Sequence, residues 1–341
     1  MRELFGVRAD GQKTYLYTIT EGTLKAQVTD FGATLVRLLV PDAKGELADV
    51  ILGFEDPDSY ANCGSFHGAI VGRNANRICN ASFMLDNRKV QLDPNDNDVN
   101  NLHSGFSPYK NRMWTVVEHT ENSVKMRLES PNGDQGFPGN AVIDVTYRLE
   151  PGGALRILYD GVSDKDTVFN MTSHTYFNMA GHDKPELAMR QILSMPARFF
   201  NPADELSIPT GECRDVANTP MDFRTPKAIG RDINDDYEPL KLQGGYDHNF
   251  EVFANPCAIL LDPVSGRGMS VSTDCPGMQI YSGNFINNEK GKDGVVYTKR
   301  SGIALETQYF PDSVNHPEWK QPFVKAGEHY HSETVFRFWA E

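Results

Sequence analysis

One carboxylate stands in the middle of a strand-like segment whose other residues give it no obvious partner. In Ser301–Phe310 (SGIALETQYF), alternation puts Glu306 on a face that it shares with small residues. A buried carboxylate without a partner is strongly destabilising. Glu306 is therefore either salt-bridged or held in a site whose function offsets that cost. The pattern supports both interpretations equally.

A histidine occupies a comparable place in Phe169–Asn178 (FNMTSHTYFN), which the alternation predicts to be one strand. One face of that strand is polar and aromatic throughout and consists of Asn170, Thr172, His174, Tyr176 and Asn178. Short hydrogen-bonding groups, an imidazole and a ring suit a sugar cleft. A solvated face usually carries Lys, Glu and Asp instead. The alternative for His174 is a histidine that is hydrogen-bonded within a sheet.

Other segments offer polar groups that suit ligand binding. Residues 72–78 (GRNANRI) contain Asn76 and Arg77 and lack the glycine spacing of phosphate-binding loops. The donor fork of Arg77 suits a sugar hydroxyl or a carboxylate, and an arginine that caps a loop is the alternative. In PGMQIYSGNF, Gln279 and Tyr281 share one face of a predicted strand.

Two titratable residues come at the ends of predicted loops. His103 follows the polar run Asp93–Asn101, and Asp247 follows a glycine turn in GGYDHNF. Loops that end in titratable residues are frequent at active sites, although turns also recruit Asp for local hydrogen bonds. The sequence leaves both interpretations open for these two residues.

Metal and nucleophile motifs are weak. His329 and His331 would share a strand face and His316 lies nearby, but no strong metal-ligand spacing joins them. No G-x-S-x-G motif is present. We therefore predict no metal and no cofactor.

The elements that must position these residues are predominantly strands. The 29 glycines and 20 prolines divide the chain into short segments rich in Val, Ile, Thr, Tyr and Phe. The predicted strands include residues 24–31, 34–40, 114–119, 123–128, 141–149, 155–162, 259–261 and 334–339. Short helices are predicted only at 56–61 and around 228–237. With no repeat or linker, this pattern favours an all-β sandwich forming one domain over residues 1–341.

Composition and charge limit the partners. A net charge of −13 would repel a phosphate backbone, so nucleic-acid binding is not expected. No apolar run approaches the roughly 18 residues of a membrane span, and the first twenty residues lack the apolar region of a secretory signal. Five cysteines without C-x-x-C spacing suggest reduced thiols. We predict a cytoplasmic protein with no membrane partner.

Taken together, the segments resemble the aldose 1-epimerase (galactose mutarotase) family in family order along nearly the whole chain. The matching blocks are GRNANRI, NLHSG, GDQGFPG, TSHTYFNMAG, PMDFRTPKAIG, GGYDHNF, PGMQIYSGNF and GIALETQYFPDSVNHPEW. The resemblance implies a large antiparallel β-sandwich with few short helices, the supersandwich of this family. It also implies interconversion of the α and β anomers of free hexoses such as galactose and glucose.

The resemblance also implies roles for individual residues. Glu306 would be the general base and His174 the general acid, with His103 beside them in contact with the sugar. The remaining sugar-binding groups would be Asn76, Arg77, Asp247, Gln279 and Tyr176. The implied partner is a small-molecule hexose bound by a monomer or a weak homodimer. At ordinary pKa values of about 4.3 and about 6.5, a carboxylate and an imidazole can act as base and acid near neutral pH.

The chain departs from the family pattern at three places. Ser104 stands where glycine is usual, Ser173 where asparagine is usual, and Lys325–Gly327 where Arg-Pro-Gly is more typical. The two serines are expected to affect the geometry of the loops at the site.

The sequence also leaves three rival functions open. One rival is a carbohydrate-binding sandwich without turnover. Another is a glycoside hydrolase with Glu306 and Asp247 about 5 to 9.5 Å apart. The third, an enzyme for sugar phosphates, is disfavoured by the acidic charge.

Overall fold

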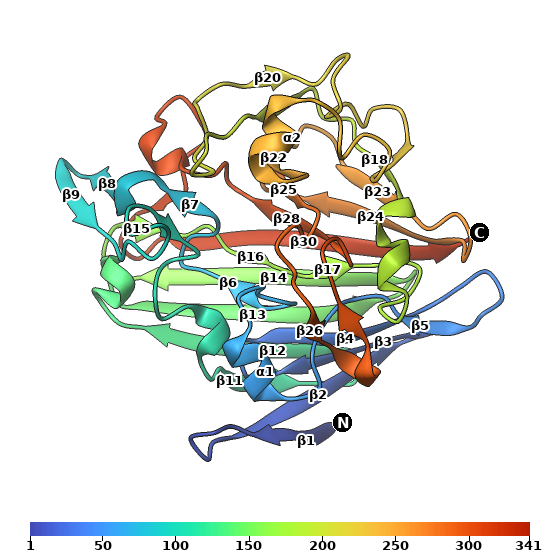
Figure 1. The fold of residues 1–341 in the computed structure, drawn as a ribbon. Coiled ribbons are helices and arrows are strands. Elements are labelled where there is room, and N and C mark those ends of the chain that lie inside the picture. The colour runs from blue at the N-terminus through green and yellow to red at the C-terminus, as the bar shows by residue number, and fades with distance from the viewer.

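The computed structural model describes residues 1–341 and consists mainly of antiparallel strands (Figure 1). The largest sheet has nine strands in the order β11-β12-β13-β14-β30-β24-β23-β18-β21. Their bounds are β11 Thr115–His119, β12 Ser123–Ser130, β13 Ala141–Glu150, β14 Ala154–Ser163, β30 His329–Ala340, β24 Arg267–Thr273, β23 Ala258–Leu261, β18 Ile192–Ser194 and β21 Lys227–Ala228.

Two smaller sheets accompany the large one. A six-stranded sheet contains β17 Tyr176–Phe177, β28 Ile303–Gln308, β25 Gly277–Tyr281, β22 Asp247–Glu251, β19 Phe199–Asn201 and β20 Arg214–Asp215 in that order. A five-stranded sheet contains β1 Arg2–Val7, β2 Lys13–Glu21, β3 Leu24–Thr29, β4 Thr34–Pro41 and β5 Leu47–Asp49. Ile51, two residues after the end of β5, forms a bridge with Phe177 of β17, so the chain that leaves the five-stranded sheet runs beside the six-stranded one.

Short ladders and helices complete the chain. The ladders are β6 Ile70–Val71 with β16 Thr172–Ser173, β7 Arg77–Ile78 with β10 Asn101–Leu102, β8 Ser82–Leu85 with β9 Arg88–Gln91, β15 Thr167–Val168 with β29 Phe323–Val324, and β26 Glu289–Lys290 with β27 Val296–Tyr297. The α-helices are α1 Pro57–Asn62 and α2 Glu238–Gln243. The 3₁₀ helices span residues 79–81, 109–111, 134–136, 185–190, 292–294 and 313–315. No helix has the length and apolar character that crossing a membrane requires.

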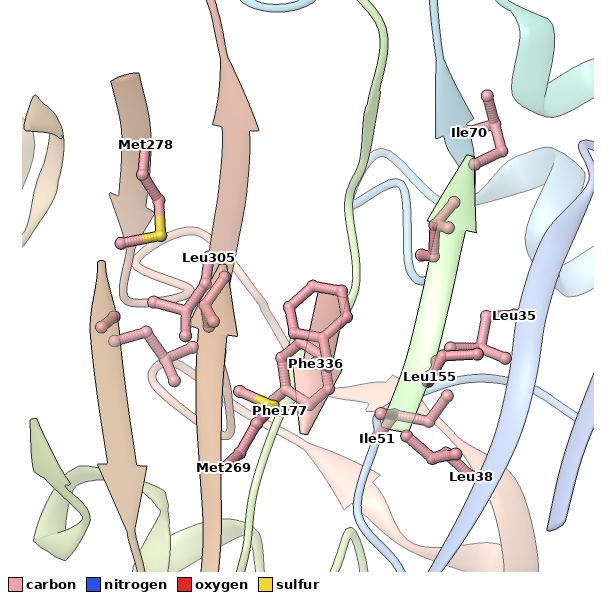
Figure 2. Close-up of a cluster of buried hydrophobic side chains, with 14 of the residues drawn as sticks. Leu35, Leu38, Ile51, Ile70, Leu155, Phe177, Met269, Met278, Leu305 and Phe336 are labelled. Carbon is pink, nitrogen blue, oxygen red and sulfur yellow. The ribbon is translucent and has the colours of Figure 1, made fainter. Parts of the chain in front are cut away.

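Both smaller sheets pack on the same face of the large sheet. Leu155 of β14 and Phe336 of β30 are paired across neighbouring strands, so their side chains point to one side. Figure 2 shows Leu155 facing Leu35 of the five-stranded sheet and Phe336 beside Phe177 of the six-stranded sheet. The ring centroids of Phe177 and Phe336 are 5.0 Å apart. The result is a sandwich with one broad sheet against two narrower ones.

Strand alternation separates the core from the outer face of the six-stranded sheet. Leu305 of β28 and Met278 of β25 point into the core (Figure 2). Their neighbours Glu306 and Gln279 therefore point to the opposite face, because successive side chains of a strand alternate. The core thus fixes the direction of the polar side chains that form the site.

The eight strands listed by residue range are all present. Seven of them match to within two residues at each end, and β30 begins five residues before the predicted start, at His329. The helix at 56–61 is confirmed as α1, whose N-cap Asp56 accepts a hydrogen bond from the Ser59 backbone N–H at 2.9 Å. The prediction of a helix around 228–237 is wrong. Ala228 ends β21, residues 229–236 form turns and bends, and α2 begins only at Glu238, with Pro239 in its first turn. Aspartates and asparagine favour such turns over helix.

Candidate active site

A pocket of about 360 Å³ opens on the outer face of the six-stranded sheet. All eight residues predicted to form the site line it: Asn76, Arg77, His103, His174, Tyr176, Asp247, Gln279 and Glu306. The structure therefore brings together side chains that lie more than 200 positions apart in the sequence. No predicted site residue lies elsewhere.

Three adjacent strands supply the carboxylates and the amide. In the ladders, Gln279 of β25 lies directly opposite Glu306 of β28, and Asp247 of β22 lies opposite Tyr281 of β25. The Gln279 amide Nε2 donates to Asp247 Oδ1 at 2.6 Å. The rigid sheet thus fixes the relative positions of both carboxylates.

His174 lies where the chain passes from one sheet to another. The prediction of a single strand over Phe169–Asn178 is wrong, because β16 pairs with β6 while β17 pairs with β28. Only His174 and Tyr176 of the predicted polar face line the pocket. The other three members of that face are buried away from it: Asn170, Thr172 and Asn178.

His174 and Glu306 face each other at short range. The distance from His174 Nε2 to Glu306 Oε1 is 3.7 Å, and both side chains are buried. Glu306 Oε2 and His174 Nδ1 have no hydrogen-bond partner within the protein, nor does Gln279 Oε1. Unsatisfied buried polar atoms are costly, so these atoms are strong candidates for hydrogen bonds to a sugar.

The ladder between β7 and β10 places Asn76 and His103 side by side. The His103 backbone N–H donates to Asn76 O at 3.1 Å, and the Asn76 N–H donates to His103 Nδ1 at 3.2 Å. With Nδ1 accepting, a neutral His103 carries its proton on Nε2. His103 is therefore arranged as a hydrogen-bond donor through Nε2.

Arg77 is held by an acidic residue that the sequence analysis did not single out. Its Nε donates to Asp96 Oδ2 at 2.9 Å, and Asp96 comes from the polar run Asp93–Asn101. This contact leaves the terminal nitrogens of the guanidinium available for a ligand. The loop-capping alternative for Arg77 does not account for its place in the pocket wall.

Burial shifts the pKa values of the central pair in opposite directions. Burial raises the pKa of Glu306 well above its usual value, and the charge of Asp247 adds to this while Arg77 opposes it. Burial lowers the pKa of His174 to about 3. The ordinary values assumed from the sequence therefore do not apply. Burial therefore favours the uncharged form of both groups, which is protonated Glu306 and neutral His174.

Comparison with known proteins decides the family. The family model described as Aldose 1-epimerase matches residues 15–337. The chain belongs to the aldose 1-epimerase family. It is 38% identical to the aldose 1-epimerase of Haemophilus influenzae, covering 96% of this chain and 97% of that protein. It is 35% identical to the galactose mutarotase of Homo sapiens, covering 99% and 98%.

Solved structures of this family share the fold. An aldose epimerase homologue from C. elegans superposes with a TM-score of 0.87 at 29% identity, covering 96% of this chain and 99% of that chain. A galactose 1-epimerase from Lactobacillus acidophilus gives a TM-score of 0.86 at 28% identity, covering 99% and 98%. The expected galactose mutarotase-like sandwich is confirmed.

The serines that depart from the aldose 1-epimerase pattern do not line the pocket. The Asn74 backbone N–H donates to Ser104 Oγ at 2.8 Å, and that hydroxyl donates to Asn74 O at 3.1 Å. The Ser173 hydroxyl is hydrogen-bonded to Thr175 Oγ1 at 2.8 Å. Lys325 forms a surface ion pair with Asp166 at 2.6 Å. These contacts are structural.

Several pocket residues escaped the sequence analysis. Phe66 and Glu289 line the pocket but lie outside every motif named above, and Phe285 lines it at the end of PGMQIYSGNF, where it was not singled out. The histidines considered for metal binding lie elsewhere: His331 pairs with Asp160, and His316 pairs with Glu318. The structure contains no group of three or more His, Cys, Asp or Glu side chains arranged to hold a metal ion.

Proposed function

We propose that the protein is an aldose 1-epimerase that interconverts the α and β anomers of free hexoses such as galactose and glucose. The observation that carries this proposal is the 3.7 Å approach of His174 Nε2 to Glu306 Oε1 in a pocket lined by polar groups. Anomer exchange needs two proton transfers at neighbouring oxygens of one carbon. A base and an acid this close together suit that requirement.

In the proposed reaction, Glu306 removes the proton from the C1 hydroxyl while His174 donates a proton to the ring oxygen. The bond between C1 and the ring oxygen breaks, and a carbonyl forms at C1. Rotation about the C1–C2 bond then presents the other carbonyl face. On reclosure, His174 recovers its proton from the hydroxyl at C5, and Glu306 returns its proton to the oxygen on C1.

The cycle needs only the one proton that His174 and Glu306 hold between them. The productive arrangement has Glu306 ionised and His174 protonated, which differs from the uncharged pair only in the position of one proton. Each turnover ends with the same total number of protons on the pair. The apparent pKa values therefore belong to the pair as a unit.

The surrounding residues provide binding groups of both kinds. The His103 Nε2–H and the free guanidinium nitrogens of Arg77 are donors, while Asp247 and Gln279 Oε1 are acceptors. A sugar hydroxyl can both donate and accept, so a mixed set of this kind suits a polyhydroxy ligand. We assign Tyr176 to the same wall, beside His174, with ring centroids 4.9 Å apart.

The charge of the pocket favours an uncharged sugar. The carboxyl groups of Asp247, Glu289 and Glu306 line it, and Arg77 is the one Arg or Lys side chain in the lining. Arg77 is already paired with Asp96. A phosphate would meet more acidic than basic groups, so a sugar phosphate is a poor substrate for this site.

We also propose that residues 1–341 form one domain that acts in the cytoplasm. The family model covers residues 15–337 without interruption, which supports one domain. All five cysteines are unpaired, and a reducing compartment would keep them so.

Polarimetry of freshly dissolved single-anomer sugars tests the proposed function. The protein should accelerate the approach of α-D-galactose or α-D-glucose to the equilibrium rotation, in proportion to enzyme concentration. Parallel assays should measure sugar binding by calorimetry and the release of reducing ends from simple glycosides. Binding without acceleration would indicate a binding module, and new reducing ends would indicate a hydrolase. Either result would overturn the proposal.

A further inference from the structure

Glu289 connects two residues that flank an aromatic ring of the pocket. The carboxylate begins β26 and lines the pocket. Its Oε1 accepts a hydrogen bond from the Ser65 hydroxyl, and its Oε2 lies 2.5 Å from His67 Nε2. Ser65 and His67 are the residues immediately before and after Phe66. One carboxylate therefore fixes both sides of Phe66.

Phe66 needs such restraint because its backbone conformation is unfavourable. Its φ is +57°, in the left-handed region that bulky residues rarely occupy. Conformations of this kind persist only where the surroundings determine them, and they cluster at functional sites. The two contacts to Glu289 supply a restraint on each side of the unfavourable residue.

The conformation of Phe66 directs its ring onto the two imidazoles of the site. The ring centroid lies 4.7 Å from that of His103 and 5.9 Å from that of His174. Phe66 itself lines the pocket. Its ring therefore limits how far either imidazole can turn.

His67 attaches this arrangement to the rigid interior. Its side chain is fully buried, and its ring lies 4.8 Å from Tyr176 and 5.0 Å from Phe54 between centroids. Burial opposes ionisation of Glu289, yet the hydrogen bonds from His67 and Ser65 hold the pKa of that carboxyl below its usual value. The link from the core to Phe66 is thus a hydrogen-bonded one with little freedom.

We propose that Glu289 is a positioning residue, which acts through Ser65 and His67 to hold Phe66 against the imidazoles of His103 and His174. This inference deepens the proposed function and rests on it. Glu289 takes no proton in the reaction. Its contribution is the orientation of the acid His174, and misplacement of a catalytic group by about 1 Å can cost on the order of a hundredfold in rate.

A double-mutant cycle measured by polarimetry tests this route. Glu289→Ala and Phe66→Ala should each lower kcat/KM by about tenfold or more, because either change frees the imidazoles. The double variant should be no slower than Phe66→Ala alone, since Glu289 acts through that ring. Glu289→Gln keeps an acceptor for Ser65 and a polar partner for His67, so it should retain most activity. Glu251→Ala, which removes an exposed pair with Arg198, is the control.

Multiplicative losses in the double variant would overturn the inference, because Glu289 would then act independently of Phe66. If Glu289→Ala does not fold, Ser65→Ala removes one of the two contacts. It should give a smaller loss that also vanishes in the Phe66→Ala background. A crystal structure of Glu289→Ala or Ser65→Ala provides a readout that needs no activity. Phe66 should leave its left-handed conformation or become disordered, and an unchanged Phe66 would contradict the inference. An inactive wild type would instead contradict the proposed function alone.

Discussion

His174 Nε2 and Glu306 Oε1 are 3.7 Å apart, too far for a good hydrogen bond and close enough for one bound group to reach both. β28 carries Glu306 within a six-stranded sheet, while His174 lies in the short connection between β16 and β17. The pair is therefore assembled by tertiary structure rather than by local sequence. Its geometry and its pKa shifts lead to the predictions below.

The first prediction concerns the pH dependence of the rate. The reactive pair carries one proton, so a second proton inactivates it at low pH and loss of the first inactivates it at high pH. The lowered pKa of His174, about 3, and the raised pKa of Glu306 separate these two limits. A plot of kcat/KM against pH should be bell-shaped with a broad plateau. A profile with only one limb between the unfolding limits would contradict a two-group mechanism.

The second prediction concerns the pH dependence of stability. Because the pKa of Glu306 is raised on folding, its stabilising contribution is complete below the usual value and is lost as pH rises towards the folded pKa. Glu306→Gln removes this loss. The variant should therefore gain stability relative to the wild type as pH rises above about 4.5. Urea unfolding at several pH values measures the difference, and a constant difference would show that Glu306 ionises normally.

His174 should show the opposite trend. Its pKa falls from 6.5 to about 3 on folding, so stability is complete above 6.5 and is lost as pH falls towards 3. His174→Asn should therefore gain stability relative to the wild type as pH falls below 6.5. The same urea series tests this prediction. A gain that grows with rising pH would be the wrong sign.

The fourth prediction concerns sugar binding by Arg77. Hydrogen bonds to charged groups contribute about 1.5 to 3 kcal/mol, so Arg77→Ala should raise KM roughly tenfold or more. Asp96→Ala leaves the guanidinium but removes its 2.9 Å partner, and it should raise KM by a smaller factor. Asp160→Ala, which breaks an exposed pair with His331, is the matched control. Unchanged KM in Arg77→Ala would place that residue outside the binding site.

The strands could be predicted from sequence because their pattern is local. In β13 and β14 every second side chain enters the core, and the glycine and proline turns between strands mark their ends. The prediction of a single strand over residues 169–178 was wrong because of the tertiary structure. Its alternation continues through His174, but the chain changes its pairing partner there, which no local period reports. The predicted helix around 228–237 is absent because its aspartates favour turns more strongly than its weak helical pattern favours a helix.

The site residues were found mainly because family motifs mark them, whereas their environment could not be predicted. Asp96 lies in a polar run whose members look alike in the sequence, and only the fold shows that it meets Arg77. Glu289 is separated by more than 200 positions from the residues that it joins. The pKa shifts of His174 and Glu306 arise from burial, which is a property of the assembled pocket.

The most direct test of the account is the kcat for anomer exchange in Glu306→Gln and His174→Asn, measured by polarimetry with α-D-galactose. Glu306→Gln keeps the shape of the side chain but cannot accept the proton, and His174→Asn keeps a donor that cannot give one up. Each should lower kcat by on the order of 10² to 10⁴, while circular dichroism stays that of the folded wild type. A folded variant with kcat near that of the wild type would show that the substituted residue is neither the base nor the acid.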